Sequence, residues 1–175
     1  MSSLVLVCCL ALGQLTAQPA DVDERHAFDF LVGTWELEQR IDIAHNRSER
    51  GDDRYVFRQP IRGGAIEASW RFNRGTEGKP DIAEAIYVSG YHTPSKAWSF
   101  YYVSERSAQH WLGRRTGQTW YFYFDEPFQF DGRTAIQRQW WERDGDARVK
   151  RHFENSYDQG KTWHLVTTAV LRRVG

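Results

Sequence analysis

The feature that most constrains this chain is a period-two alternation of apolar and polar side chains that begins near residue 35 and recurs almost to the C-terminal end. In the first such run, Trp35, Leu37 and Ile41 alternate with Glu36 and Glu38. Successive side chains of a β-strand point to opposite faces, so this alternation is typical of a strand with one buried face. Helical periodicity is nearly absent after the first run begins, and the sequence therefore predicts an all-β chain.

Ten runs of this kind can be delimited, and each is bounded by turn residues such as Gly-Gly, Asp-Gly or Thr-Pro. The predicted strands span residues 35–43, 55–59, 66–72, 82–92, 98–104, 109–115, 119–124, 134–143, 147–155 and 162–172. Short connections favour antiparallel pairing of consecutive strands. We therefore expect a single antiparallel up-and-down barrel of about eight to ten strands, because closure removes exposed edges. The one predicted helix is short, at residues 23–31.

The first twenty residues differ from the rest. Residues 1–20 carry no charged side chain, and an apolar run at residues 4–12 precedes the small residue Ala17. This pattern predicts a secretory signal too short to span a membrane, followed by a barrel domain at residues 21–175. The mature protein would then be periplasmic or secreted, and without thiols, because Cys8 and Cys9 are the two cysteines of the chain. A lipoprotein is the alternative, although Val7 is larger than the residue expected before a lipid-attachment cysteine.

Charge and aromatic content bound the function. The chain has 23 Lys plus Arg and 23 Asp plus Glu, so no basic excess points to nucleic acid or an anionic membrane as a partner. Its 8 Trp, 8 Tyr and 10 Phe all follow residue 20. Aromatic rings suit half-buried strands, and they also suit the wall of a small-molecule site. The simpler interpretation is that the rings fill the core.

Two motifs resemble a known group of proteins. The run Phe-Asp-Phe-Leu-Val-Gly-Thr-Trp at residues 28–35 resembles the opening of calycin-type barrels, the lipocalin and fatty-acid-binding superfamily. It is more closely similar to the "DFDFxxGxW" opening of a group of exported bacterial proteins. Those proteins also carry a "DGGKTW" strand near their end, which the run Ser-Tyr-Asp-Gln-Gly-Lys-Thr-Trp at residues 156–163 resembles. The resemblance implies a lipocalin-like barrel and no particular activity.

The residues of the first motif have a structural explanation. Gly33 would let the chain pass closely under the barrel, and Trp35 would plug the closed end with Phe28 and Phe30 covering it. A short helix before such a plug fits the same arrangement.

The second motif also has a structural explanation. Asp158 can accept backbone N–H bonds within its own turn, Gly160 can adopt the positive φ that the turn needs, and Trp163 would pack beside the hairpin. The pattern resembles the Asp-box of sialidases as well, but it occurs once here, which argues against a sialidase.

Arginines on apolar faces are the most informative candidates for binding. Arg138 shares its strand face with Trp140, and Arg151 shares its face with Val149. If these faces point inward, each guanidinium needs a partner, because a buried charge is costly unless paired. The partner is either Glu142 or a ligand carboxylate, which arginine binds in a fork. Alternatively, both arginines reach water at strand ends and bury only their stems.

Three functional hypotheses follow from these patterns. The leading one is an exported binding protein for a small apolar or aromatic molecule, with or without a carboxylate, held inside the barrel. The predicted ligand-binding residues are Gln39, Trp98, Tyr102, His110, Arg138, Trp140 and Arg151. An alternative is a barrel enzyme, an isomerase, cyclase or hydrolase, that pairs His110 or a tyrosine with Glu142. A second alternative is a partner-binding domain with a filled core, whose exposed tyrosine face would favour a homodimer.

No catalytic residue, metal site or cofactor is predicted. The final hairpin would place His152 opposite His164, but His152 alternates with Lys150 and Glu154, which indicates a solvent-facing position. The related nitrobindin-type barrels hold haem through one histidine. The run Gly-Thr-Trp at residues 33–35 is compatible with that group, but none of the six histidines here can be matched to theirs.

Overall fold

The computed structural model describes residues 23–61, 63–73, 79 and 81–174. The predicted signal segment at residues 1–20 and most of the predicted loop at residues 75–81 lie outside the described residues. The predicted helix is present as two single turns of 3-10 helix, η1 (Glu24–His26) and η2 (Asp29–Leu31).

Strands make up nearly all of the remaining described chain. They are β1 (Gly33–Asp42), β2 (Arg47–Glu49), β3 (Arg54–Ile61), β4 (Ala65–Asn73), β5 (Ile82–His92), β6 (Ala97–Ser104), β7 (Ala108–Thr116), β8 (Thr119–Phe130), β9 (Arg133–Asp144), β10 (Arg148–Ser156) and β11 (His164–Arg173). Each of the ten predicted strands has a counterpart among them. The sequence pattern missed β2, whose three residues are all exposed, because a strand without a buried face shows no alternation.

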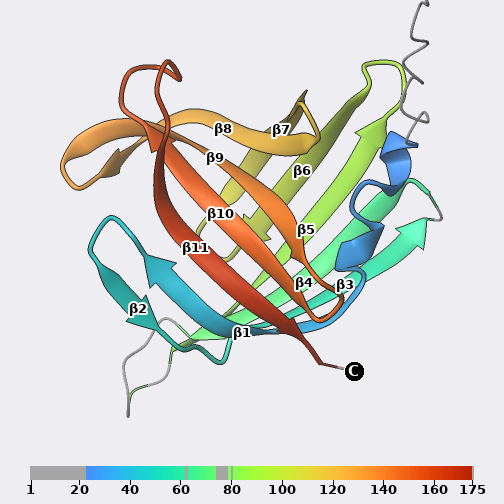
Figure 1. Cartoon of the computed structure of the whole chain (residues 1–175), viewed down its shortest axis with the longest axis horizontal. Helices are drawn as coiled ribbons and strands as arrows, with labels where there is room; N and C mark the ends of the chain where they lie inside the picture. Colours follow the sequence, from blue (N-terminus) through green and yellow to red (C-terminus); the bar gives the residue numbers. More distant parts are fainter. Residues whose placement is uncertain (1–22, 62, 74–78, 80, 175) are drawn as a thin grey trace, which may run out of the picture.

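Ten of these strands close into an antiparallel up-and-down barrel, as the alternation predicts (Figure 1). Consecutive strands from β3 to β11 are hydrogen-bonded neighbours, and β1 closes the ring by pairing with β3 on one side and β11 on the other. The register of the closing pair runs from Trp35 opposite Arg173 to Asp42 opposite Thr167. The short β2 lies beside the second half of β1 and extends one end of the barrel wall.

A β-bulge in β1 changes which side chains face inward. The register with β11 shifts between Leu37 and Gln39, so the second half of the strand is turned over relative to the first. Gln39 is exposed and donates from Nε2 to Ser48 Oγ at 2.8 Å, whereas Arg40 faces the interior. The predicted inward position of Gln39 is therefore wrong, because an extra residue in a strand reverses the faces beyond it.

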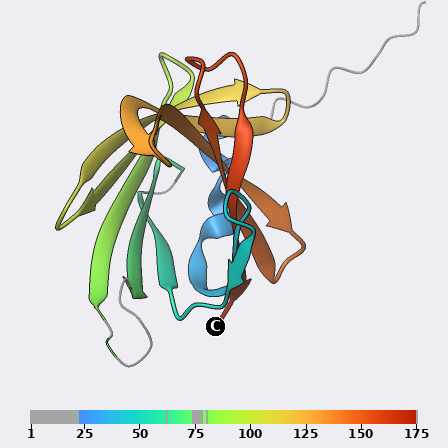
Figure 2. The ribbon, with the colours of Figure 1, turned by 90° about the vertical axis from the view of Figure 1, so that its left-hand side faces the viewer.

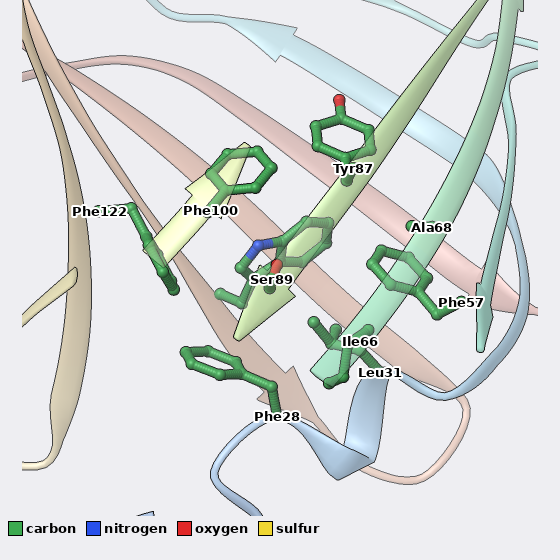
Figure 3. Close-up of a pocket in the computed structure, with 10 residues that line it drawn as sticks. Phe28, Leu31, Phe57, Ile66, Ala68, Tyr87, Ser89, Phe100 and Phe122 are labelled. Atoms are coloured by element: carbon green, nitrogen blue, oxygen red, sulfur yellow. The ribbon is translucent and has the colours of Figure 1, made fainter. Parts of the chain in front are cut away.

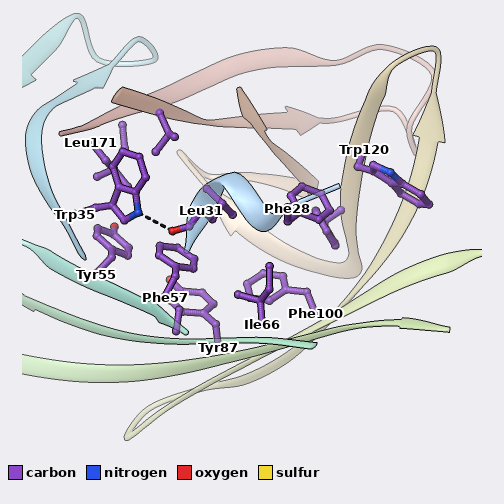
Figure 4. Packing of buried hydrophobic residues seen from close by; sticks show 14 of the residues in the cluster. Phe28, Leu31, Trp35, Tyr55, Phe57, Ile66, Tyr87, Phe100, Trp120 and Leu171 are labelled. Carbon is purple, nitrogen blue, oxygen red and sulfur yellow. Dashed lines mark hydrogen bonds between the residues drawn. The ribbon is translucent and has the colours of Figure 1, made fainter. Parts of the chain in front are cut away.

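The segment that contains η1 and η2, here called the plug, sits between the two walls of the barrel and closes one of its ends (Figure 2). Phe28 packs edge-on against the ring of Trp98, with centroids 5.1 Å apart, and against Phe122 at 5.4 Å. The indole N–H of Trp35 donates to the carbonyl of Leu31 at 2.7 Å (Figure 4). The hydrophobic core is therefore continuous with this plug.

At the start of β1, Gly33 lies close to the side chain of Arg173. This residue has a φ of +138°, and a Cβ there would overlap the guanidinium of Arg173. Arg173 in turn donates to the carbonyls of Val32 at 2.8 Å and Phe30 at 2.9 Å. The positive φ therefore favours glycine at position 33, beside the hydrogen bonds from Arg173 of β11 to this segment.

The turn before β11 is held by side-chain hydrogen bonds. Asp158 Oδ1 accepts the backbone N–H of Thr162 at 2.9 Å, which is the main reason that the pKa of Asp158 is lowered to about 2. Gly160 has a φ of +87°. Trp163 lies edge-on to the ring of Tyr123, with centroids 5.6 Å apart, beside the hairpin.

Candidate functional site

The end of the barrel opposite the plug, here called the wide end, contains a cavity of about 650 Å³. It opens where β1 and β4 end, and its wall combines aromatic rings with a few polar side chains. The lining residues are Arg40, Glu49, Tyr55, Trp70, Phe72, Asn73, Phe130, Gln137, Arg151, Phe153, Val166, Thr167 and Ala169. Sites for small molecules span about 300–1,000 Å³ and have such walls.

A second space of about 220 Å³ adjoins the first. Trp70, Gln137, Arg151 and Phe153 line both spaces, so these side chains stand at the junction. Tyr102 belongs to the smaller space, together with other inward residues of β5 to β7.

The plug end of the interior is filled instead. Its cavity measures about 30 Å³, which leaves room for a water-sized molecule at most. Figure 3 shows the rings of Phe28, Phe57, Phe100 and Phe122 converging on this space. A further space of about 220 Å³ lies between the plug segment and the ends of β7, β8 and β9. The largest of these spaces is the one at the opposite end of the barrel.

Arg151 is the central polar group of the wide end. The residue is only 5% exposed, and its Nε donates to Gln139 Oε1 at 2.6 Å while its Nη1 donates to Tyr87 Oη at 3.1 Å. Its guanidinium carbon lies 4.6 Å from the ring centroid of Phe153 and 5.1 Å from that of Trp141. Within the described residues, no carboxylate forms an ion pair with Arg151, and its Nη2 donates no hydrogen bond.

A second inward arginine, Arg40, differs because its charge is compensated. Its Nη2 lies 2.7 Å from Asp53 Oδ2 and its Nη1 lies 3.0 Å from Glu49 Oε1. The indole of Trp70 also donates to Asp53 Oδ2 at 3.2 Å. Burial raises the pKa of Asp53, and the charge of Arg40 opposes that rise. Of these two interior guanidinium groups, only Arg151 is left without a counter-charge among the described residues.

Two tyrosine hydroxyls beside Arg151 are kept neutral. Burial raises the pKa of Tyr87 to about 12, against the lowering effect of Arg151, and burial also raises the pKa of Tyr55. At neutral pH both hydroxyls therefore serve as hydrogen-bonding groups and supply no anion to Arg151.

The amide that orients Arg151 is itself incompletely bonded. Gln139 is fully buried and gives its carbonyl oxygen to Arg151, but its Nε2 has no hydrogen-bond partner. Leaving a buried donor unpaired costs about 1–3 kcal/mol. An arrangement that carries this cost holds the guanidinium in place without optimising the stability of the fold.

The structure separates the sequence-predicted ligand residues into two groups. Tyr102 and Arg151 line the interior spaces. Trp98 also faces inward but is fully buried in the plug-end core, where its indole donates to the carbonyl of Glu24 at 2.9 Å. Gln39, His110, Arg138 and Trp140 lie on the outer surface, so their predicted inward positions are wrong.

The positions predicted in β9 are wrong because aromatic and polar residues occur on both faces of this strand. Gln139 and Trp141 face inward, so Arg138 and Trp140, which alternate with them, must face outward. Arg138 pairs with Glu154 at 2.5 Å on the outside of the barrel. Both faces of β9 carry aromatic and polar residues, and the sequence pattern could not decide between them.

His152 also lies on the outside, and its neighbours differ from the predicted ones. The register places it opposite Thr168, whereas His164 is opposite Asn155, so the expected pairing of the two histidines is wrong. The ring nitrogens of His152 lie 3.0 Å from Thr168 Oγ1 and 3.1 Å from Glu142 Oε2. Burial lowers the pKa of His152, and the bond to Glu142 opposes that change.

The sequence pattern did not predict three residues that surround Arg151 or line its cavity, namely Tyr87, Gln139 and Trp70. Period-two alternation with Ala83 and Ala85 could have marked Tyr87 as inward. No comparable signal marks Gln139, because a polar residue between apolar neighbours is normally assigned to the solvent face.

None of the residues that line the three interior spaces described above is a histidine. Over the described residues there is no group of three or more His, Cys, Asp or Glu side chains arranged to hold a metal ion. The same part of the chain has no helix that is both long and apolar enough to cross a bilayer.

Comparison with known proteins identifies the fold. No protein-family model matches the chain, and no curated protein matches its sequence. Among solved structures, the chain is similar to the S-type phycobiliprotein lyase from Guillardia theta, with a TM-score of 0.54 and 14% identity over 90% of this chain and 98% of that one. At this identity the likeness shows the fold alone, a calycin-like ten-stranded barrel.

Proposed function

We propose that this chain is an exported binding protein that holds a small, largely aromatic molecule in the wide end of its barrel. We propose further that this molecule carries a carboxylate or a similar anionic group. The size of the cavity, about 650 Å³, and its aromatic lining support the first part. Export rests on the predicted signal at residues 1–20.

The observation that carries the proposal is the uncompensated guanidinium of Arg151. It is buried at the junction of two interior spaces and has no carboxylate partner among the described residues. Several kcal/mol is the usual penalty for desolvating such a charge. A ligand carboxylate supplies the missing charge, and it can accept a hydrogen bond from the Nη2 that Arg151 leaves free.

The remaining wall fits the body of such a molecule. Trp70 and Phe72 stack on each other with centroids 4.0 Å apart at the mouth of the cavity, and Phe153 lies beneath Arg151. These rings offer flat apolar surface to an aromatic ligand whose anionic group points at Arg151.

The interior of the barrel bears on both alternatives. The enzyme alternative loses the two residues named for it, because His110 and Glu142 both lie on the outer surface, whereas Glu49 and Tyr55 line the cavity. A filled core would leave no interior space, whereas the wide end is hollow.

The test compares two fluorescent probes that differ by one charged group. Anilinonaphthalene sulfonate carries an anion, and phenylnaphthylamine is its neutral parent. We expect the purified protein to bind one molecule of either probe, and to prefer the sulfonate by about 10-fold to 100-fold, because a hydrogen bond to a charged group contributes roughly 1.5–3 kcal/mol. Arg151→Met should abolish this preference while leaving the neutral probe bound.

Arg138→Met is the matched control, because Arg138 lies outside the barrel and should not affect either probe. If neither probe binds stoichiometrically, the interior binding site is disproved. If both probes bind but Arg151→Met leaves the preference unchanged, the anionic part of the proposal is disproved and the apolar part stands.

A further inference from the structure

The outer face of β5, β6 and β7 carries a continuous group of exposed apolar side chains, here called the β5–β7 patch. Its members are between 41% and 54% exposed. They are Ile86, Val88, Tyr101, Val103 and Leu112. The three strands form the wall opposite β1 and β11, and η1 and η2 lie between the walls rather than over this face (Figures 1 and 2). A contiguous apolar surface of this kind marks an interaction site.

Strand register fixes the layout of the patch. Val88, Tyr101 and His110 lie side by side in one row across β5, β6 and β7. The ring of His110 stacks on that of Tyr101, with centroids 4.4 Å apart, which flattens the middle of the face. Tyr101 is therefore the centre of the patch.

Charges flank the patch at two diagonally opposite corners. Glu84 lies on β5, four residues from Val88 in one direction, and Arg114 lies on β7, four residues from His110 in the other direction. Both side chains are on the outer face. Because Tyr101 lies midway between them, an acid and a base stand at equal distances on either side of one central ring.

We propose that the β5–β7 patch is the contact between two copies of this chain, related by a two-fold axis that lies in the interface and crosses the strands at Tyr101. An axis perpendicular to the line between Glu84 and Arg114 exchanges these two positions, so each glutamate faces the arginine of the other copy. The same axis brings Val103 of one copy opposite Leu112 of the other, because the line from Val103 to Leu112 is nearly parallel to the line from Glu84 to Arg114. The patch is thus complementary to itself, as a two-fold interface requires.

The expected dimer is weak. The two charged corners lie roughly 27 Å apart along the strands at about 3.4 Å per residue, and the patch is only three strands wide at about 4.8 Å each. Such an area falls below the roughly 800 Å² per partner of a standard interface. We therefore expect monomer at low micromolar concentration and dimer at concentrations near millimolar.

Sedimentation velocity over that concentration range tests the proposal. The mass should rise from one chain towards two, and Val103→Glu should hold the protein at one chain throughout. Ile61→Glu is the matched control, because Ile61 is 62% exposed on β3 but lies outside the patch. A constant single-chain mass for the unaltered protein overturns the proposal, and so does a dimer that Val103→Glu leaves intact.

Charge reversal tests the two-fold arrangement itself. Glu84→Lys alone and Arg114→Glu alone each place like charges at both corners, and each variant should remain monomeric. When the two variants are mixed, every corner pairs opposite charges, so a heterodimer should form at least as readily as the dimer of the unaltered protein. A mixture that stays monomeric, with both variants folded by circular dichroism, overturns the proposed axis.

Discussion

The two ends of this barrel are built from the same strands but are packed in different ways. At the plug end, Phe28 and Leu31 complete a core whose remaining space is about 30 Å³. At the wide end, inward rings surround about 650 Å³, and Arg151 sits among them without a counter-charge from the described residues. The comparison indicates that the plug end supplies stability and that the wide end is kept open at some cost to stability.

The polar groups inside the barrel follow the same division. At the plug end, the indoles of Trp35, Trp98 and Trp120 are all bonded to the segment that precedes β1. At the wide end, Gln139 Nε2 is buried without a partner. A fully bonded end is expected to be rigid, whereas an end with unpaired donors is suited to accept groups from a ligand.

Matched phenylalanine truncations should show the difference in packing between the two ends most clearly. Phe28→Ala removes a ring that is packed against Trp98 and Phe122, and it should lower the free energy of unfolding by about 3–5 kcal/mol. Phe72→Ala, at the mouth of the cavity, should cost roughly 1 kcal/mol, because its removal enlarges an existing space. Urea denaturation of both variants measures the two values. Equal losses would contradict the division between a packed end and an open end.

Matched arginine replacements should differ in their effect on stability. Arg40→Met leaves Asp53 buried without its ion-pair partner and should cost roughly 1–3 kcal/mol, less than for a fully buried pair because Arg40 is 31% exposed. Arg151→Met removes an uncompensated charge but also removes the donor to the buried Gln139 Oε1. These two effects should offset each other, and the stability of the ligand-free protein should change by less than about 1 kcal/mol. Denaturation of the two ligand-free variants provides the comparison. A large loss in Arg151→Met would show that Arg151 is a structural residue.

The smallest expected effect concerns His152 and the outer face. Burial lowers the pKa of His152 from 6.5, so the folded state favours the neutral ring. The contribution of this group is therefore fully present above about pH 6.5 and is lost as the pH falls towards the lowered pKa. His152→Gln should reduce the loss of stability on acidification from about pH 7 to about pH 5. His164→Gln, at an exposed position, serves as the control, and identical pH profiles for all three proteins would contradict the prediction.

Local patterns were sufficient to predict most of the strands and the closure of the barrel. Alternation in β5, from Ala83 to Val88, shows buried and exposed residues in strict order, and the turns at Gly132 and Gly145 join neighbouring strands. The candidate site was harder to predict, because its position depends on which face of each strand is inside. In β9 both faces carry rings and polar groups, so the inward Gln139 and the outward Arg138 could not be distinguished.

The sequence by itself determined the all-β class and most of the strand positions, because these depend on side-chain periodicity and on turn residues within a short stretch of chain. Only the tertiary structure decided that Arg151 lies inside the cavity while Arg138 lies outside. It also decided that a bulge after Leu37 turns Arg40 inward. The physical reason is that the inner and outer faces of a strand are defined by its neighbours across the sheet, and those neighbours are distant in sequence.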